Sequence, residues 1–238
     1  RGATLQFGTG ALTAVLGPNG AGKPTLLRAA LGSIKATSGA VHLNGVPIET
    51  VPPIEKARAV AYLPQTRSLA WPVRVREAVA LGRYAYGAGL GREAERDAIA
   101  ITRAMDACAL TPLRERHTDT LSGGELARVH LARAFATEAP LLIADEPIAA
   151  LDPRHQLDVM ALFCAYVDAG NGAVVILHDP SLAARYADRL VWMKDGAIIA
   201  DGSPAETLTK ARMAEVYGGE AEVEVKEGRP QATLLRSL

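Results

Sequence analysis

Short apolar runs alternate along this chain with longer segments in which apolar residues return every three or four positions. The runs have the length of β-strands, and they occupy residues 11–16, 59–63, 141–144 and 173–177. The longer segments predict helices at residues 26–31, 73–83, 91–110, 126–136 and 154–169. Because the last two runs lack polar alternation, we expect them to be buried in a parallel sheet, and the chain is predicted to be an α/β protein.

Turn signals and a period of two predict smaller β elements beside this sheet. Asn44-Gly45 predicts a hairpin within residues 41–48, and Asp195-Gly196 predicts a second hairpin. Strict alternation over residues 220–225 predicts a terminal edge strand that pairs with residues 232–235. The chain is therefore expected to carry a small antiparallel β part.

Helical patterns dominate between residues 66 and about 116, where a glycine-rich turn at residues 84–91 separates two of them. We interpret this segment as part of a helical lobe that is inserted between sheet strands. A mixed run of charges within it is expected to be a solvated helix face. The run consists of Arg92, Glu93, Glu95, Arg96 and Asp97.

A glycine-rich loop joins the first predicted strand to the helix that follows. It comprises Gly17, Pro18, Asn19, Gly20, Ala21, Gly22, Lys23, Pro24 and Thr25. Its glycines let the backbone turn N–H groups inward, while the helix dipole and Lys23 add positive charge. The loop is predicted to bind phosphate groups, and the alternative is a loop that only turns the chain.

Pro24 departs from the phosphate-loop pattern G-x-x-x-x-G-K-[ST], in which the last hydroxyl binds Mg²⁺. Proline suits the first turn of a helix, but it removes an N–H that would face phosphate and a hydroxyl that would face the metal. Each charge-assisted contact of this kind contributes about 1.5–3 kcal/mol. Thr25 lies about 100° further around the helix and is a poor substitute. We expect weakened nucleotide binding and a larger defect in Mg²⁺-dependent chemistry.

Polar side chains follow three of the predicted strands, at the sheet edge where open α/β sheets bind ligands. Gln65 follows the second strand, Asp145 and Glu146 follow the third, and His178 follows the fourth. An acidic pair there can divide two roles, with Asp145 holding Mg²⁺ through water and Glu146 accepting a proton from an attacking water. The alternatives are a solvated loop for the acidic pair, a solvated glutamine and a structural histidine.

Ser122, Gly123, Gly124 and Glu125 precede the helix predicted at residues 126–136. Ser122 and Glu125 have the spacing of a capping box, which is one interpretation of this sequence. The other interpretation is a second anion site, because two glycines expose the backbone N–H groups at the start of a helix. The residues alone leave both interpretations open.

Composition limits the class of protein further. The 26 Lys and Arg equal the 26 Asp and Glu over 238 residues, so the count gives no basic face for nucleic acid. Cys108 and Cys164 lack metal-type spacing and are expected to be buried thiols in a reducing compartment. No apolar run approaches the roughly 18 residues of a membrane span, and no signal peptide is evident, so a soluble cytoplasmic protein is expected.

The order of these motifs resembles the ATP-binding subunit of ABC transporters across nearly the whole chain. The sequence LSGGE, placed after a helical insertion and before LLIADEP, is highly specific to that family. The motifs that carry the resemblance are, in order, the phosphate loop, Gln65, residues 121–125, residues 141–146, residues 150–152 and His178.

The resemblance implies a P-loop NTPase fold with a RecA-like parallel sheet. The core is expected at residues 1–65 and 137–238, with the helical subdomain and its signature motif at residues 66–136. In the family a first strand and an aromatic residue that stacks on adenine precede the phosphate loop. This chain begins too late to contain them, so we expect this part to be missing.

The resemblance also implies ATP and Mg²⁺ as cofactors, bound between two copies of the chain. Glu146 would be the general base, His178 would contact the γ-phosphate, and Gln65 would sense a metal that Asp145 also holds. Lys23 would support catalysis by binding phosphate. The nucleotide would further contact the rest of the phosphate loop and, from the partner, Ser122, Gly123, Gly124 and Asp152.

Residues 64–77 and 178–189 resemble importers of iron-siderophore, haem or cobalamin type, with haem as the first candidate. The implied partners are membrane permease subunits and, indirectly, a periplasmic binding protein, with no nucleic acid. The subunit would lie at the cytoplasmic face of the inner membrane. Ile148 stands where the family usually has Thr or Ser, which we expect to be a mild change.

Two other functions compete with ATP-driven import. The first is a subunit that binds nucleotide but hydrolyses it poorly because of Pro24. The second is an ABC ATPase of DNA repair or translation. Such proteins carry long heptad insertions or tandem cassettes, and this sequence shows no sustained heptads, which disfavours that interpretation.

Overall fold

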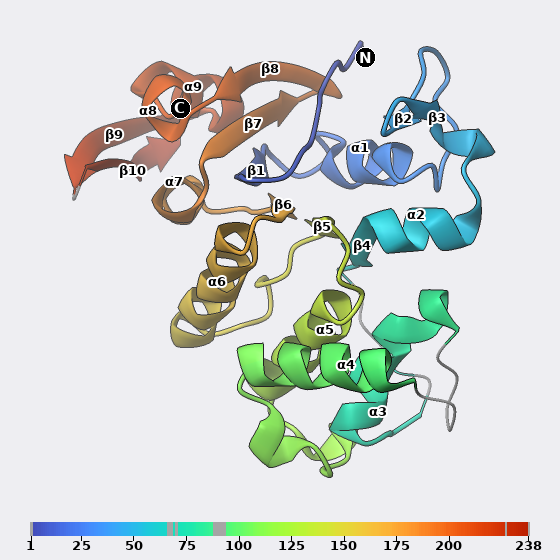
Figure 1. Ribbon diagram of the computed structural model, residues 1–238. Coiled ribbons are helices and arrows are strands. Elements are labelled where there is room, and N and C mark those ends of the chain that lie inside the picture. The colour runs from blue at the N-terminus through green and yellow to red at the C-terminus, as the bar shows by residue number, and fades with distance from the viewer. Residues whose placement is uncertain (1, 66–68, 70, 88–93, 227, 238) are drawn as a thin grey trace.

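A six-stranded sheet in the order β4-β5-β6-β1-β7-β8 runs through the middle of the computed structural model (Figure 1). The structure describes all residues except 1, 66–68, 70, 88–93, 227 and 238. Neighbouring strands pair in parallel except β7 and β8, which form an antiparallel hairpin, so the predicted α/β class is confirmed. The strands are β1 (Leu12–Leu16), β4 (Val60–Leu63), β5 (Leu141–Ala144), β6 (Gly172–Ile176), β7 (Arg189–Lys194) and β8 (Ala197–Gly202).

Alternate residues of the strands enter two separate hydrophobic cores. On β1, Leu12 and Leu16 belong to one core and Val15 belongs to the other. Helix α1 (Lys23–Ala30) packs on the Val15 side, whereas α5 (Gly123–Phe135), α6 (Pro153–Asp168) and α7 (Pro180–Tyr186) pack on the opposite side. The central strands are therefore buried on both faces, which explains their unbroken apolar runs.

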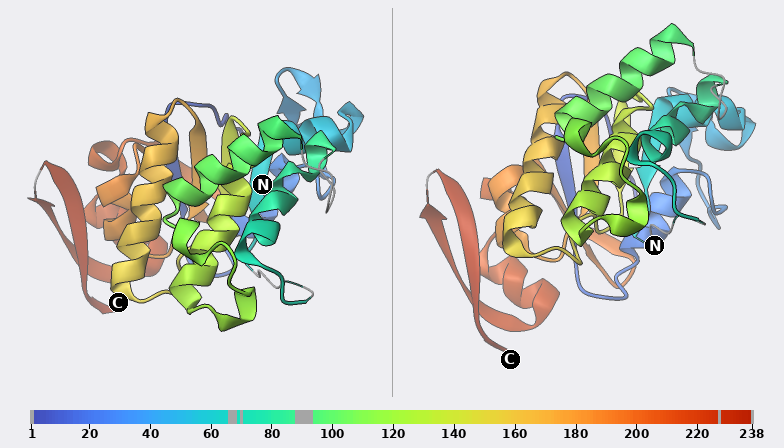
Figure 2. Two further views of the ribbon diagram at one scale, coloured as in Figure 1. Left: turned by 60° about the horizontal axis from the view of Figure 1, so that its bottom comes forward. Right: turned by 90° about the horizontal axis from the view of Figure 1, so that it is seen from below.

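The α-helices that the structure describes between β4 and β5 gather in a lobe at one side of the sheet (Figures 1 and 2). They are α3 (Val75–Ala80), α4 (Glu95–Ala107) and α5. The helix predicted at residues 73–83 is too long, because a 3₁₀-helix, η2 (Leu81–Tyr86), replaces its end and the start of the predicted turn. Gly82 lies so close to the Arg133 carbonyl of α5 that a side chain there would overlap it. The rest of that turn, and residue 66 where the helical subdomain was expected to begin, lie outside the described residues, so the subdomain bounds stay a prediction.

The charge run predicted to be solvated is only partly exposed. Glu95 and Arg96 are exposed, but Asp97 is 2% exposed and its carboxylate lies 2.9 Å from the buried Arg83 guanidinium. Arg83 also donates to the Ala136 carbonyl. The prediction for Asp97 was wrong because its partner comes from η2, which only the tertiary fold brings beside α4. Arg92 and Glu93 lie outside the described residues.

The predicted hairpins are present. Asn44 and Gly45 join β2 (His42–Leu43) to β3 (Val46–Pro47), and β9 (Gly219–Lys226) pairs with β10 (Arg229–Ser237). The latter pair forms a sheet of its own at the end of the molecule opposite β2 and β3, rather than extending the main sheet (Figure 2). The remaining elements are η1 (Ile48–Thr50), α2 (Pro53–Ala59), η3 (Thr111–Leu113), η4 (Thr118–Thr120), α8 (Pro204–Thr207) and α9 (Lys210–Tyr217).

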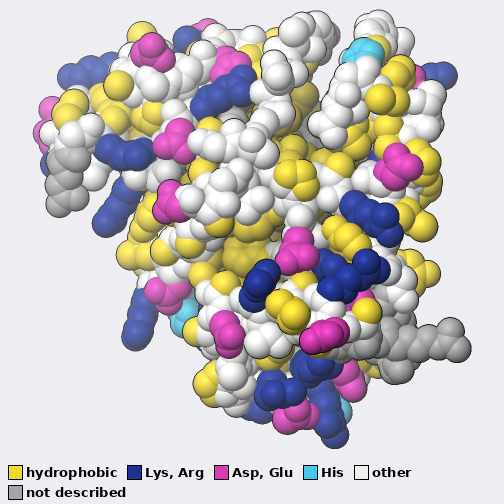
Figure 3. Space-filling model, viewed as in Figure 1, with side chains coloured by type: hydrophobic (Ala, Val, Ile, Leu, Met, Phe, Trp, Pro, Cys, Tyr) yellow, Lys and Arg dark blue, Asp and Glu magenta, His cyan; other side chains and the backbone are white. Residues whose placement is uncertain are grey.

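The charged surface agrees with what the composition predicts, whereas only one of the two cysteines does. Basic and acidic side chains are interspersed over the face shown in Figure 3. Cys108 is buried, which raises the pKa of its thiol to about 12, whereas Cys164 is only half-buried, contrary to prediction. Within the described residues, no helix has both the length and the apolar character that a membrane span requires.

Candidate functional site

Lys23 lies beneath the glycine-rich loop and is 2% exposed. Its ammonium group donates hydrogen bonds to the carbonyls of Gly17 at 2.6 Å and Pro18 at 2.9 Å. Burial lowers the pKa of this ammonium group, while the negative charges of Glu146 and Asp145 oppose that change. The cation is thus held at the loop, with two carboxylates close enough to influence it.

Two glycines of this loop have distinct structural roles. Gly17 has a φ of 148° and approaches β7 so closely that a side chain would overlap the carbonyl oxygen of Met193. Gly22 has a φ of 91° and forms the left-handed N-cap of α1. The loop therefore requires glycine at one position for space and at the other for backbone conformation.

Helix α1 begins at Lys23, three residues earlier than predicted. The cause is Gly22, which ends the loop, and Pro24, whose fixed φ suits the first turn. Pro24 directly follows the buried lysine and offers neither an N–H nor a side-chain oxygen at this position. Thr25 is exposed in the same turn.

Three predicted side chains converge at the carboxyl ends of the neighbouring strands β4, β5 and β6. Gln65 Nε2 donates to Glu146 Oε2 at 2.7 Å, and His178 Nε2 lies 2.7 Å from Glu146 Oε1. Each carboxylate oxygen of Glu146 therefore has a side-chain neighbour. The backbone of Glu146 has a φ of 49°, a conformation that is uncommon outside glycine and that clusters at functional sites.

Asp145 lies next to this group and is 2% exposed. Its Oδ1 atom is buried and accepts no hydrogen bond within the part of the chain that the structure describes. Burial and then the negative charge of Glu146 raise the pKa of the Asp145 carboxyl, although Arg28 and Lys23 act in the opposite direction. A buried carboxylate oxygen without a donor suits a bound cation or a water molecule.

A cavity of about 180 Å³ opens beside Glu146 and His178. It extends from β5 to α7, so space for a small molecule lies next to the carboxylate. Its other lining residues are Ile148, Ala149, Gln156, Ile176, Leu177, Asp179 and Leu182.

The LSGGE segment forms a capping box, which is one of the two interpretations that the sequence left open. Ser122 Oγ accepts from the Glu125 N–H at 3.3 Å, and Glu125 Oε2 accepts from the Ser122 N–H at 2.8 Å. Gly123 is exposed in the first turn of α5, whereas Gly124 is buried. A side chain at Gly124 would overlap the imidazole of His155.

His155 links this turn to the start of α6. The ring atom Nδ1 of His155 lies 2.7 Å from Asp152 Oδ2, and the backbone N–H of His155 donates to Asp152 Oδ1 at 3.0 Å. Asp152 is therefore the N-cap of α6, and the ring of His155 fills the space beside Gly124. Ser122, Gly123, Gly124 and Asp152 thus form a second group, in which His155 connects Gly124 to Asp152.

This geometry can be compared with known proteins. A family model described as ABC transporter matches residues 1–149, which is more than half of the chain. This chain belongs to the ABC transporter family. The hemin import ATP-binding protein HmuV of Streptomyces coelicolor is 42% identical over 222 residues, which cover 93% of this chain and 79% of that protein.

Two solved structures of ABC cassettes also match this ABC protein. One is an ATP-binding cassette in its ADP conformation, with a TM-score of 0.80 and 27% identity, covering 91% of each chain. The other is a dimeric cassette in a post-hydrolysis state with ADP and phosphate bound, with a TM-score of 0.71 and 25% identity, covering 84% of this chain and 88% of that one. The P-loop ATPase fold predicted from the sequence is confirmed.

Sequence reasoning missed three contributors to the site of this ABC protein. The Met193 carbonyl restricts Gly17, His155 restricts Gly124, and the charge of Arg28 partly opposes the rise in the pKa of Asp145 that burial causes. A histidine three residues after Asp152 is a signal that could have been found. The contributions of Met193 and Arg28 depend on where the fold places a backbone carbonyl and a helix, and no sequence motif predicts these positions.

Proposed function

We propose that this chain is the ATP-binding subunit of an importer and couples ATP hydrolysis to uptake of haem or another iron chelate. The observation that carries the proposal is the convergence of Gln65 and His178 on Glu146, beside the phosphate loop. The name of the Streptomyces coelicolor relative, a hemin import ATP-binding protein, supports haem as the substrate class.

The chain's own residues suit hydrolysis of a phosphoanhydride. The loop N–H groups and Lys23 neutralise phosphate charge, since both lie at the start of α1. Glu146 accepts a proton from water, because Gln65 and His178 hold its carboxylate in one orientation. His178, which is partly exposed, is placed to reach the γ-phosphate.

A divalent metal fits part of this site. The Asp145 Oδ1 atom is buried without a donor among the described residues, and Gln65 lies nearby with its amide on Glu146. We assign Mg²⁺ to Asp145 and Gln65, where it would neutralise phosphate charge when bound. Pro24 provides no oxygen ligand, so this site has fewer side-chain ligands than the phosphate-loop pattern offers.

The second group of residues would act on the nucleotide of a partner copy. Gly123 is exposed at the start of α5, and Ser122 and Asp152 are the N-caps of α5 and α6. The dimeric cassette with ADP and phosphate bound supports a paired arrangement. We further propose that the dimer binds permease subunits at the cytoplasmic face of the inner membrane and meets a periplasmic binding protein only indirectly.

The function is tested by reconstitution in proteoliposomes. The neighbouring coding sequences supply the permease and binding protein, and phosphate release is measured with haem, a ferric siderophore or cobalamin present. We expect stimulation by haem and expect Glu146→Gln to lower hydrolysis roughly 10²–10⁴-fold while ATP binding persists. If another substrate stimulates phosphate release, that substrate replaces haem as the proposed cargo. A Glu146→Gln variant that still hydrolyses ATP would refute Glu146 as the general base.

Pro24 favours a second candidate function, a subunit that binds nucleotide without efficient hydrolysis. The residue lies in the first turn of α1, directly after Lys23, where it removes one N–H and one hydroxyl from the site. Two charge-assisted contacts are lost, and the contacts from the rest of the loop remain.

The two candidates differ in their response to Pro24→Ser. If Pro24 impairs the site, the purified chain binds ATP but releases little phosphate with Mg²⁺, and Pro24→Ser raises the rate by at least about tenfold, as one charge-assisted contact allows. ATP affinity is measured by fluorescence of a nucleotide analogue, and the rate by phosphate release. Equal rates for both chains would show that Pro24 causes no defect.

A further inference from the structure

The C-terminal hairpin holds both ends of α7, the helix that begins two residues after His178. Ser181, in the first turn, donates through its hydroxyl to the Ala232 carbonyl at 2.7 Å and accepts from the Ala232 N–H at 2.8 Å. At the other end, the Arg229 guanidinium donates to the carbonyls of Ala184 at 3.2 Å and Ala187 at 2.9 Å. Both partners of α7 belong to β10.

These contacts provide hydrogen-bond partners for backbone groups of β10 and α7 that have none within the hairpin or the helix. Ala232 lies opposite Val223 in the β9–β10 pair, and its own N–H and C=O turn toward α7. The Ser181 hydroxyl thus takes the place of a third strand at this edge. Arg229 caps the carbonyls of the last turn of α7, which have no partner within the helix and carry the negative end of its dipole.

Helix α7 is connected directly to the site. Asp179 caps it, accepting from the N–H groups of Ser181 at 2.8 Å and Leu182 at 3.1 Å. Leu182 lines the same cavity as His178 and Glu146. A shift of α7 along the sheet would therefore move the backbone of His178, whose ring lies 2.7 Å from Glu146.

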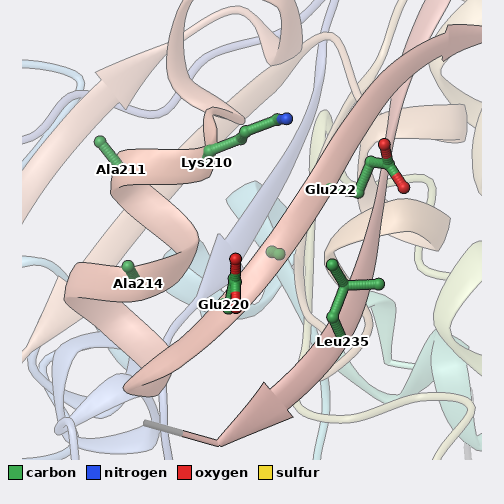
Figure 4. Close-up of a pocket in the computed structure, with 7 residues that line it drawn as sticks. Lys210, Ala211, Ala214, Glu220, Glu222 and Leu235 are labelled. Carbon is green, nitrogen blue, oxygen red and sulfur yellow. The ribbon is translucent and has the colours of Figure 1, made fainter.

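The other side of the hairpin is less closely packed. A groove of about 560 Å³ lies between α9 and β9, and Figure 4 shows side chains of both elements along it. On the α7 side, Ser181 and Arg229 make polar contacts that attach the hairpin to the body of the protein. The groove is lined by Lys210, Ala211, Ala214, Glu220, Ala221, Glu222 and Leu235.

We propose that the C-terminal hairpin positions His178 against Glu146, through the contacts that Ser181 and Arg229 make. Ser181 and Arg229 are positioning residues, since they act through α7. The proposal rests on the proposed function, in which His178 reaches the γ-phosphate. It adds that a segment about fifty residues further along the chain, as the separation of Ser181 from Ala232 shows, sets the geometry of the site.

The first test measures the position of the His178 ring without catalysis. The chain has five histidines, and the ring signals of the labelled protein are recorded by NMR, with His178→Gln assigning one of them. We expect Ser181→Ala and Arg229→Ala to shift the His178 signal toward its position in Glu146→Gln, while Ser181→Thr restores it. The matched control is Arg185→Ala, which removes an exposed cation from the same helix.

The second test measures ATP hydrolysis by the full chain. We expect Ser181→Ala to lower kcat roughly three- to tenfold, as part of the energy of the two neutral hydrogen bonds of its hydroxyl allows, with KM for ATP unchanged. In a His178→Gln background the same change should have no further effect, because the hairpin acts through that ring. A general loss of stability would instead lower both backgrounds equally.

The outcomes separate this inference from the proposed function. An unmoved His178 signal in folded Ser181→Ala overturns the positioning role, whatever the chain hydrolyses. A shifted signal in a chain without any ATPase activity supports the positioning role and contradicts the proposed function. If Arg229→Ala fails to fold by circular dichroism, Ser181→Ala and its Thr control decide alone.

Discussion

Single residues of the phosphate loop are constrained by different forces, and the chain offers a direct comparison. Gly17 is fixed by contact with β7, since a side chain would overlap the Met193 carbonyl, and its φ is 148°. Gly22 is fixed by conformation only, since a side chain there would meet its neighbours at ordinary contact distances of 3.7 and 3.8 Å. The first position depends on the tertiary fold and the second depends on the local turn.

We therefore expect Gly17→Ala to destabilise the protein more than Gly22→Ala. Left-handed backbone strain costs about 1–2 kcal/mol for either change, and overpacking against β7 adds about 1–3 kcal/mol at Gly17. The free energies of unfolding are measured by urea denaturation without nucleotide. Equal losses of unfolding free energy for the two variants would show that β7 shifts to accommodate the added methyl group without a measurable free-energy penalty.

Helix α5 shows how a cap can serve stability while its neighbours remain available for a ligand. Hydrogen bonds from the backbone and then the side chain of Ser122 lower the pKa of the Glu125 carboxyl. The folded-state pKa lies below the unfolded value, so this carboxylate stabilises α5 fully above about pH 5. The stabilisation is lost as the pH falls through the lowered folded-state pKa.

The capping box predicts a pH-dependent effect of Glu125→Gln. We expect the variant to lose about 0.5 kcal/mol of unfolding free energy near neutral pH, the scale of an exposed carboxylate at a helix start. This difference should shrink as the pH falls through the lowered folded-state pKa, because wild type then also carries a neutral group. Urea denaturation over a series of pH values from neutral into acid measures it, with Glu95→Gln as control, because α4 has no side-chain cap. A difference in unfolding free energy that persists in acid would show that the charge of Glu125 does not stabilise α5.

The contact between η2 and α4 is the clearest case of an element held by buried charge. Arg83 and Asp97 are each 3% exposed in their side chains and are 2.9 Å apart. The guanidinium also lies 3.8 Å from the centre of the Tyr86 ring. The exposed Glu138 carboxylate lies 3.0 Å from the same guanidinium, so removal of Asp97 leaves Arg83 with one acidic partner instead of two.

We expect Asp97→Ala to lower the free energy of unfolding by about 1.5–3 kcal/mol, the contribution of a hydrogen bond to a charged group, because Glu138 still compensates Arg83. Asp97→Asn keeps a hydrogen-bond acceptor for Arg83 and should cost less. Thermal and urea unfolding measure both variants. The control, Asp158→Ala, removes an exposed carboxylate from α6 and should change stability by less than about 0.5 kcal/mol. An Asp97→Ala variant as stable as the control would show that Glu138 alone compensates Arg83.

At the scale of the whole molecule, the proposed site is incomplete in one copy. The group around Glu146 lies at the strand ends, and the group around Ser122 lies at the start of α5, where Gly124 meets His155 rather than the phosphate loop. We assign the second group to a partner's nucleotide. On this view ATP joins two copies, and its hydrolysis releases them.

Gly123→Glu tests that assembly without disturbing the fold. Gly123 is exposed with no atom within 4 Å of an added side chain, and a carboxylate in a first helical turn is favourable. We expect unchanged stability but loss of the ATP-induced dimer, because the new charge repels a triphosphate. Light scattering in a Glu146→Gln background measures the dimer, and Gly123→Ala is the control. A dimer that persists in Gly123→Glu would place the interface elsewhere.

The sequence by itself determined the features that depend on neighbouring positions. The glycine loop before α1, the capping box of Ser122 and Glu125, and the apolar runs of β5 and β6 were all predicted. Each has a local cause, namely backbone freedom, a hydrogen bond across three residues, or burial on both faces of a strand. The order of these motifs also fixed the family.

The tertiary structure decided which distant groups share a site or a contact. Parallel pairing brought Gln65 and His178 within 2.7 Å of Glu146, and chain packing buried Asp97 against Arg83 and attached β10 to α7. These pairs lie between 14 and 81 positions apart along the chain. No local propensity encodes such contacts, because they depend on the strand order and on which helix faces meet.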